Sequence, residues 1–374
     1  MRLLFVSHSL PPEGREMDNL GGMQRVAVDL HDSLSAHSGA EVRALVLRSS
    51  WNERGYRTPL FLARALREIR RLARAKEVDA ILFSSMLTAT LIVPLRRLLS
   101  RNGIRAAAIV NGLDATTPTW PYPLLVRRTF HALDLVMPIS RATGEACIAR
   151  GLDRNKSKVV SLGIRSDRFA LRADRAEARR HLAVPQTDPR LILCSVGRLV
   201  PRKGVEWFVS QVMPLLPDDV VYLVAGEGPD RARIEAAIAA NNLRSRVSLA
   251  GSISDAELEN LYYGSDLFVM PNVPVANDME GFGLVMLEAG LCGLPTIASR
   301  LEGITDVISE GQNGHLVPSL DADAFRSVIL RYYADPSLLA DASSRAREFT
   351  LSRFGWSGVV DQYISAVRQL LETA

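Results

Sequence analysis

The chain has only three cysteines and four lysines among its 374 residues, and it has no long hydrophobic run. Cys147, Cys194 and Cys292 lie far apart in apolar segments without metal-ligand spacing, which argues against a disulfide framework or a zinc site. The longest apolar runs, such as Leu191–Val196, fall far short of the ~20 residues of a membrane span. Leu3–Val6 is too short for the core of a signal peptide. We therefore expect a cytoplasmic protein with buried, reduced thiols.

The net charge of +4 conceals an uneven distribution of charge along the chain. Residues 1–190 hold 31 basic and 18 acidic side chains, whereas the remainder holds 14 basic and 23 acidic ones. Two halves of opposite sign indicate two units with different partners. The basic half suits nucleic acid, an anionic membrane surface or an acidic substrate.

Short apolar runs alternate with amphipathic helical patterns from end to end. Continuous apolar strands indicate burial on both faces, and alternation with helices indicates a doubly wound α/β architecture, here present twice. The runs that we expect to form strands are Leu3–Ser7, Val42–Leu47, Ala80–Ser84, Ala106–Val110, Leu135–Ile139 and Val159–Leu162 in the first half, and Leu191–Val196, Val220–Ala225, Val247–Leu249, Leu267–Met270, Thr296–Ala298 and His315–Val317 in the second.

The boundary between the two halves is marked by a polar, charged stretch over residues 165–190. We place a linker at about 165–170, which gives an N-terminal domain of residues 1–168 and a C-terminal domain of residues 169–354. From Phe354 onward, apolar residues at helical spacing predict one amphipathic helix, 355–374, with no strand after it.

Two glycine-rich loops follow expected strands and suit anions. Gly21 and Gly22 precede a helix, and the free N–H groups of a helix start favour an anion, although a plain flexible loop is the alternative. Gly197 ends a buried strand and is followed by three cations within six residues, among them Arg198 and Lys203. This spacing is not that of a P-loop. The two cations either converge on a diphosphate or are solvated loop charges.

Two further strand ends also carry glycine. Taken alone, residues 226–229 predict only a turn. Gly251 and Ser252 either present backbone groups to a nucleotide base or form a simple connection.

Two glutamates make the strongest pattern. Glu280 precedes a glycine-rich turn, and Glu288 lies eight residues on, about two turns into an otherwise apolar helix. A carboxylate in such a helix costs free energy unless it is satisfied, and the hydroxyl pair of a ligand would satisfy it. The alternative is one glutamate at a helix start, favoured by the helix dipole, and a second reaching solvent.

Taken together, these motifs resemble glycosyltransferases of family 4 over nearly the whole chain. The residues that carry the resemblance are Gly21-Gly22, Gly197-Arg198, Lys203-Gly204, Gly226–Pro229, Gly251-Ser252 and the run from Glu280 to Glu288, which reads E-G-F-G-L-V-M-L-E. The resemblance implies a GT-B fold, with two Rossmann-like domains, a retaining enzyme and an active site in the cleft between the domains. It also implies a nucleotide-diphosphate sugar held by the C-terminal domain and a glycan or lipid-linked acceptor on the other side.

By the same resemblance, each motif residue has an expected role. Arg198 and Lys203 meet the diphosphate, Glu288 the ribose of the nucleotide and Glu280 the transferred sugar. The backbone of the following turn adds hydrogen-bond donors, and the Gly21-Gly22 loop closes over the phosphate and sugar. The set expected to bind the nucleotide sugar comprises Gly21, Gly22, Gly197, Gly251, Ser252, Gly281, Phe282, Gly283, Leu284 and Glu288. The last helix is expected to cross back to the N-terminal domain.

One position departs from the family pattern. Family members often have a histidine where this chain has Asn111, at the end of an apolar strand and before Gly112. An asparagine can hydrogen-bond a sugar hydroxyl but cannot carry a proton. We expect Asn111 to line the sugar pocket, the alternative being an asparagine that caps the turn. His8, at another strand end, is the alternative for a proton-transferring role.

No D-x-D motif stands on an expected strand-end loop, and we expect no metal and no cofactor beyond the co-substrate. Cations aimed at the departing diphosphate would then lower the barrier.

A competing interpretation rests on the basic segment from Arg64 to Lys76. Its arginines alternate with aliphatic residues but with no aromatic platform, which disfavours nucleic acid. A helix with one apolar and one cationic face suits an anionic membrane. The chain is then either a peripheral membrane transferase or a membrane- or polyanion-binding protein that binds nucleotide sugars without transferring them.

Overall fold

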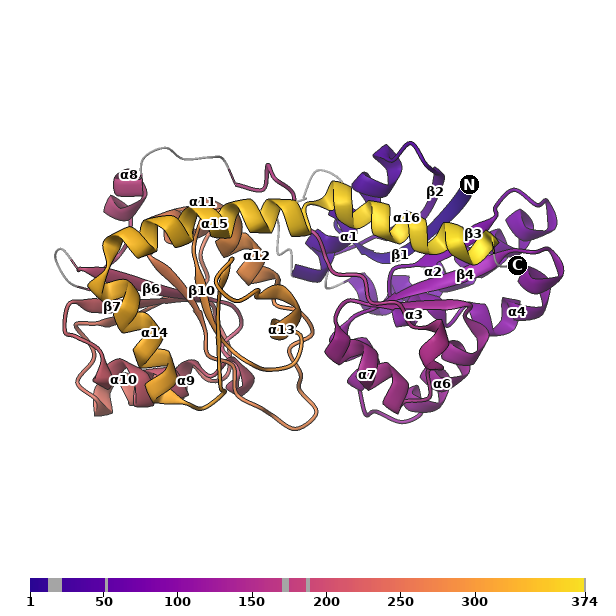
Figure 1. Ribbon diagram of the computed structural model, residues 1–374. Helices are drawn as coiled ribbons and strands as arrows, with labels where there is room; N and C mark the ends of the chain where they lie inside the picture. Colours follow the sequence, from indigo (N-terminus) through magenta and orange to yellow (C-terminus); the bar gives the residue numbers. More distant parts are fainter. Residues whose placement is uncertain (13–21, 51–52, 170–174, 186–188, 373–374) are drawn as a thin grey trace. The chain divides into compact units, whose positions relative to one another are not determined.

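A computed structural model describes residues 1–12, 22–50, 53–169, 175–185 and 189–372. They form two compact units (Figure 1): unit 1 comprises Met1–Arg165 and Phe354–Ala374, and unit 2 comprises Ser166–Arg353. The expected domain limits at 168 and 354 lie within a few residues of these. In the described part of the chain, no helix combines the length and apolarity needed to span a membrane.

Unit 1 is built on a five-stranded sheet in the order β2-β1-β3-β4-β5. All four strand pairs are parallel, and the central strands are buried on both faces, as the continuous apolar runs predict. The strands are β1 (Arg2–Leu10), β2 (Glu41–Arg48), β3 (Ala80–Phe83), β4 (Arg105–Val110) and β5 (Leu135–Pro138).

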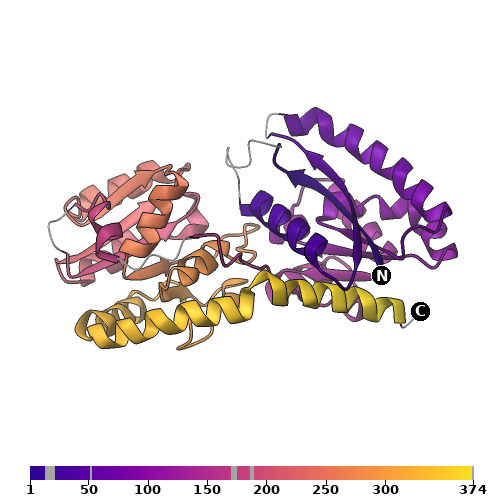
Figure 2. The same cartoon turned by 90° about the horizontal axis from the view of Figure 1, so that it is seen from above.

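Helices cover both faces of this sheet. On one face α2 (Arg54–Arg74), α4 (Ile92–Arg101) and α6 (Tyr122–Ala132) bury apolar side chains in one core with those of β1, β3 and β4. The other face carries α1 (Gly22–Ala36) and α16 (Trp356–Glu372), which contact each other (Figures 1 and 2). The shorter helices are α3 (Met86–Ala89), α5 (Gly112–Thr116), α7 (Arg141–Ala149) and the 3₁₀ turn η2 (Arg154–Lys156).

One expected element of unit 1 is wrong. Val159–Leu162 is not a strand, although the backbone N–H of Val160 donates to the carbonyl of Pro138 at the edge of the sheet. The last helix, expected over 355–374, is confirmed and belongs to unit 1; Gly355, which pairs with Ile164, separates it from the helix before it. Phe354 therefore ends α15 (Pro336–Phe354), and α16 begins at Trp356.

Unit 2 contains a six-stranded parallel sheet in the order β11-β10-β9-β6-β7-β8. Its central strands β6, β7 and β9 are almost wholly buried. The strands are β6 (Leu191–Val196), β7 (Val220–Ala225), β8 (Val247–Gly251), β9 (Leu267–Met270), β10 (Thr296–Ser299) and β11 (Gly314–Val317).

The helices of unit 2 again lie on both faces of the sheet. The core on one face is formed by Phe208, Tyr222 and Phe325, whose rings pack together, with Ile234 of α10. The elements are α8 (Arg175–Arg180), η3 (Pro201–Lys203), α9 (Val205–Trp207), η4, a π-helical turn (Phe208–Val212), η5 (Met213–Leu215), α10 (Arg231–Ala240), α11 (Asp255–Gly264), α12 (Leu284–Leu291), α13 (Ile304–Val307), α14 (Ala322–Ala334) and α15.

Glycines allow the loops at the carboxyl ends of these strands to pack backbone against backbone. Gly226 has φ 140°, and a Cβ there would lie 1.9 Å from the carbonyl oxygen of Gly197. Gly204 has φ 66°, and a Cβ there would lie 1.9 Å from the carbonyl oxygen of Pro271. The loops after β6, β7 and β9 are thus held together at one edge of the sheet, so that the 226–229 turn is more than a connection.

Candidate functional site

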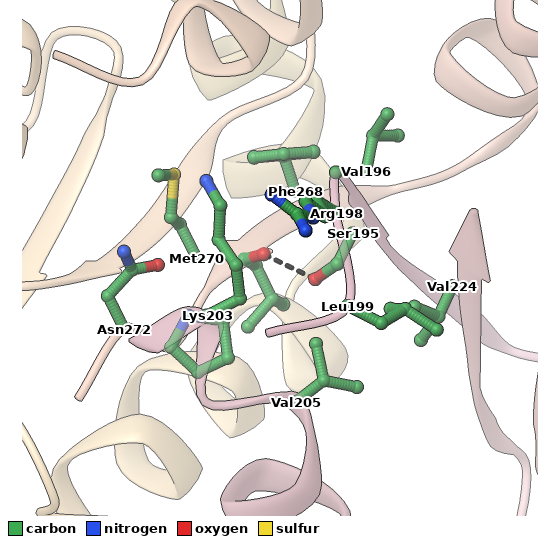
Figure 3. A pocket seen from close by; sticks show the side chains of 13 residues that line it. Ser195, Val196, Arg198, Leu199, Lys203, Val205, Val224, Phe268, Met270 and Asn272 are labelled. Atoms are coloured by element: carbon green, nitrogen blue, oxygen red, sulfur yellow. Dashed lines mark hydrogen bonds between the residues drawn. The ribbon is translucent and has the colours of Figure 1, made fainter. Parts of the chain in front are cut away.

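A pocket of about 300 Å³ opens at the carboxyl ends of β6 and β9 (Figure 3). Parallel α/β sheets bind their ligands at this edge. The two strands are tied together there because the Ser195 hydroxyl donates to the carbonyl of Val269 at 2.5 Å. Arg198 and Lys203 line the pocket, and Figure 3 shows both side chains extending toward the same side of it.

A buried carboxylate lies at the centre of the charged groups in this region. Oε2 of Glu280 accepts hydrogen bonds from Lys203 Nζ at 2.6 Å and from Asn272 Nδ2 at 3.2 Å, and it also accepts one from Arg202. Arg202 is shared with Asp278 at 2.9 Å. Lys203 and Glu280, which the sequence assigned to different parts of the ligand, are therefore brought together as an ion pair.

Burial and charge act in opposite directions on Glu280. Burial opposes ionisation of its carboxyl group, but the nearby charges of Lys203 and Arg202, together with their hydrogen bonds, outweigh burial and lower its pKa. The backbone N–H of Glu280 donates to Glu302 Oε2 at 2.5 Å. Burial raises the pKa of Glu302 itself. Glu280 is thus held as an anion whose Oε2 is fully occupied.

The glycine-rich turn after Glu280 leads directly into α12. Gly283 caps the helix with φ 89°, and a Cβ there would lie 2.6 Å from Cε of Met286. Phe282 is buried, whereas Gly281 and Leu284 are partly exposed. Because α12 begins at Leu284, Glu288 lies just past its first turn, and the expectation of about two turns is wrong.

Glu288 is held by an aromatic hydroxyl and faces an arginine. Tyr262 donates to Oε2 of Glu288 at 3.0 Å, and Arg168 Nε lies 3.9 Å from Oε1. Arg168 also donates to both carboxylate oxygens of Asp255 at 3.2 Å and covers the ring of Phe169 at 4.6 Å. The carboxylate in the apolar helix is therefore satisfied by protein groups.

The strand end after β8 lies beside the loop after β7. Gly251 accepts a hydrogen bond from the backbone N–H of Gly226 at 2.8 Å, and Ser252 is exposed. The loops carrying Gly197, Gly226 and Gly251 thus follow adjacent strands β6, β7 and β8 at one edge of the sheet.

Unit 1 has a second pocket, of about 370 Å³, at the carboxyl edge of its own sheet. Asn111 lines it and is buried; its Nδ2 donates to Asp114 Oδ2 at 3.2 Å, while its Oδ1 has no partner. Burial raises the pKa of Asp114. Ser85, another lining residue, lies 3.3 Å from Nδ1 of His8. Gly22 begins α1, and Gly21 lies outside the described residues.

Three polar residues that contact the predicted site residues were not themselves predicted from the sequence to have a role in the site. Arg202, although counted among the loop cations, supplies one of the ion pairs to Glu280, and Asn272 donates to the same carboxylate. Asp114 orients the amide of Asn111. Asn272 follows the end of β9, so the strand-end rule would have found it. Asp114 lies three residues after Asn111, a local spacing that the sequence already contains. The contact of Arg202 with Glu280 joins residues 78 positions apart and arises only through tertiary packing.

Comparison with known proteins identifies two sequence families along the chain. Residues 20–168 match Glycosyltransferase Family 4, and residues 174–349 match Glycosyl transferases group 1. An amylovoran biosynthesis glycosyltransferase of Erwinia amylovora is 30% identical over 54% of this chain and 48% of its own. A GDP-mannose-dependent α-(1-6)-phosphatidylinositol monomannoside mannosyltransferase of Mycolicibacterium smegmatis is 27% identical over 77% of this chain and 76% of its own. The chain thus spans about half the length of the first relative.

Solved structures share the fold over the full length of the chain. Anabaena HepE in complex with UDP superimposes with a TM-score of 0.74 at 19% identity, covering 99% of this chain and 100% of that one. A sucrose-phosphate synthase from Thermosynechococcus elongatus superimposes with a TM-score of 0.75 at 21% identity, covering 100% of both chains. The two parallel-sheet units are the Rossmann-like domains of a GT-B fold, and the chain belongs to the family 4 glycosyltransferases.

Proposed function

We propose that the protein is a retaining glycosyltransferase that moves a hexose from a UDP- or GDP-linked sugar to a hydroxyl group of a glycan or lipid-linked acceptor. The observation that carries this is the cluster of Arg202, Lys203 and Glu280 beside the pocket that Arg198 lines. Relatives support the donor class, since one is named for its dependence on GDP-mannose and one structure holds UDP. Family membership does not favour a binding protein without transferase activity.

Charge stabilisation of the leaving group is the main catalytic contribution in this proposal. As the bond from the anomeric carbon to the diphosphate breaks, negative charge gathers on the departing oxygen, and Arg198 and Lys203 stabilise it. The acceptor oxygen forms the new bond on the same face of the sugar, and its proton passes to a departing phosphate oxygen. Glu280 holds the sugar and keeps Lys203 in place, and Glu288 binds the ribose of the nucleotide. In this scheme the acceptor side is supplied by unit 1, with Asn111 lining the sugar pocket.

A donor panel tests this proposal. UDP-, GDP- and ADP-sugars are compared by thermal shift and by transfer or hydrolysis, all in excess EDTA, and the anomeric configuration of the product is read by NMR. We expect one donor to stabilise the protein, by about 2.7 kcal/mol at 100-fold excess over Kd. Turnover should continue in EDTA because the side-chain cations take the place of a metal.

Three outcomes contradict separate parts of the proposal. An inverted anomer would exclude retention. Loss of turnover in EDTA that magnesium or manganese restores would exclude metal independence. Absence of both stabilisation and turnover with every donor would exclude a nucleotide sugar as the co-substrate.

A lipid-linked acceptor is favoured by the surface of α2. Its exposed face carries Tyr56, 62% exposed, and Leu60, 70% exposed, at one end, and arginines along the rest. The exposed basic residues of this surface are Arg64, Arg67, Arg70, Arg71, Arg74 and Lys76. The apolar face of α2 that the sequence assigned to a membrane packs instead in the core of unit 1. Attraction to an anionic bilayer is therefore proposed from these cations, with Tyr56 and Leu60 as the exposed apolar side chains.

We expect the intact protein to sediment with anionic vesicles at low salt and to dissociate as ionic strength rises. The double variant Arg64→Gln/Arg67→Gln should bind more weakly, because each basic residue near an anionic surface contributes about 1 kcal/mol. A matched control is Arg326→Gln/Arg353→Gln, which removes the same charge from exposed positions of unit 2. Equal loss in both variants, or no binding by the wild type, would indicate an ordinary solvated helix and a non-lipid acceptor.

A further inference from the structure

Asn272 occupies a fixed position at the carboxyl end of β9. Its side chain is 1% exposed and lines the pocket of unit 2. Two hydrogen bonds hold the backbone around Asn272. The N–H of Val273 donates to the carbonyl of Arg202 at 3.0 Å, and the hydroxyl of Ser319 donates to the carbonyl of Asn272 at 2.8 Å. Asn272 is therefore a fixed, buried residue of the pocket wall.

The contact with Glu280 determines which atom of the Asn272 amide, the nitrogen or the oxygen, bonds to the protein. Nδ2 donates to Glu280 Oε2 at 3.2 Å. The reverse orientation would place the amide oxygen against a carboxylate whose lowered pKa keeps it ionised, so the orientation is set by charge as well as by hydrogen bonding. Oδ1 is consequently turned away from Glu280.

This oxygen has no partner in the described protein. Asn272 Oδ1 is buried and accepts no hydrogen bond. Buried polar atoms without partners are rare in native proteins, and each one is a candidate for a ligand contact. Asn111 in unit 1 shows the same arrangement, because its Nδ2 is bound to Asp114 while its buried Oδ1 has no partner and it lines a pocket.

The chemistry of a nucleotide sugar determines which part of it Oδ1 can meet. An amide oxygen only accepts hydrogen bonds, and an ionised diphosphate has no donor to offer. The diphosphate therefore suits Arg198 and Lys203, whereas Oδ1 requires a hydrogen-bond donor. Beside Glu280, which is assigned to the transferred sugar, that donor is a sugar hydroxyl. In the view of Figure 3 the amide oxygen points toward Met270, a flexible side chain that can repack to admit a ligand group.

We propose that Asn272 determines specificity for the transferred sugar, its Oδ1 accepting a hydrogen bond from one sugar hydroxyl while Glu280 fixes the orientation of its amide. This rests on the proposed function, since it presumes that the pocket holds a nucleotide-diphosphate sugar. The contact selects donors that carry a hydroxyl at one ring position over deoxy sugars at that position.

The test compares binding of a nucleoside diphosphate with binding of its sugar conjugate by calorimetry. The probes are UDP with UDP-glucose and GDP with GDP-mannose, in the wild type and in Asn272→Leu, which keeps the branched shape of the side chain without polar atoms. We expect Kd for the sugar conjugate to rise about three- to tenfold in the variant, as for the loss of one neutral hydrogen bond, with Kd for the nucleoside diphosphate within twofold. Ser352→Ala removes an exposed hydroxyl of unit 2 that donates to the carbonyl of Phe349, and it should leave both values unchanged.

Deoxy donors test the same contact in the wild-type protein, so the result does not depend on how the variant folds. One deoxy analogue of the sugar should bind the wild type about three- to tenfold more weakly than the parent donor, and Asn272→Leu should not distinguish the two. Equal weakening of nucleoside diphosphate and sugar conjugate in the variant would overturn the assignment. Equal binding of all deoxy analogues by the wild type would do so as well. Failure of the wild type to bind any nucleotide or conjugate would overturn the proposed function, and this assignment with it.

Discussion

Replacing Arg198 by alanine is expected to lower kcat by about 10²–10³, equivalent to roughly 3–4 kcal/mol of transition-state stabilisation. The guanidinium lines the pocket and is exposed, so its removal leaves no buried group without a partner. It is not among the groups that bind Glu280, unlike Lys203 and Arg202. The loss should therefore fall on the step in which charge develops on the diphosphate, with the melting temperature unchanged.

Steady-state kinetics with thermal melting decide whether Arg198 has this role. Arg244→Ala removes an exposed arginine elsewhere in unit 2 and is the matched control, for which kcat should be unchanged. Arg198→Lys keeps the charge but not the two-pronged geometry, and it should recover part of the rate. A higher KM with intact kcat in Arg198→Ala would mean that the residue binds donor and transition state equally, which contradicts the assigned role.

Substitution of Glu280 by glutamine is expected to abolish most activity and also to destabilise unit 2. The carboxylate is the shared partner of Lys203 and Arg202, whose side chains are only 14% and 18% exposed. Removing one member of a buried ion pair costs about 3–5 kcal/mol, because the remaining charges lose their partner. For a domain of this size the melting temperature should fall by on the order of 10 °C.

The pH dependence of stability provides an independent measurement on Glu280. Its folded-state pKa is lowered from the usual 4.5, so its contribution to stability is complete above pH 4.5 and is lost as the pH falls from there through the folded value. Glu280→Gln should lack this acid limb. Asp278→Asn, which removes the partly exposed second partner of Arg202, should cost less than about 1 kcal/mol and retain the limb. Equal losses in the two variants would contradict a central role for Glu280.

The repeating architecture could be predicted because it depends on local patterns. Continuous apolar runs such as Leu191–Val196 and Val220–Ala225 became buried parallel strands, since nothing but a covered sheet accommodates them. Val159–Leu162 is a shorter run that contains Ser161. It follows the edge of β5, with Val160 donating a backbone hydrogen bond to Pro138, but Val159 is 41% exposed and the segment does not form a strand. The break at Gly355 depends on pairing with Ile164, almost 200 residues away, which no local pattern contains.

The positions of the site residues could be predicted from the sequence, but their hydrogen-bond partners within the protein could not. Strand-end placement and resemblance located Arg198, Lys203, Glu280 and Glu288. The sequence did not indicate that Lys203 and Glu280 bind each other, because their contact joins residues 77 positions apart. The sequence also did not indicate which atom of Asn111 is available to a ligand. Its Nδ2 donates to Asp114, so only Oδ1 is left for a sugar hydroxyl.

The discontinuous course of unit 1 has a consequence for biosynthesis on the ribosome. Residues 1–165 emerge first, yet their domain lacks α16 until the last residues of the chain have been made. That helix buries Trp356, Val360, Tyr363 and Ile364 in unit 1. Unit 2, by contrast, is continuous and needs no segment from outside Ser166–Arg353. Residues 1–165 therefore keep an apolar face uncovered while all of unit 2 is being synthesised, and only α16 closes it.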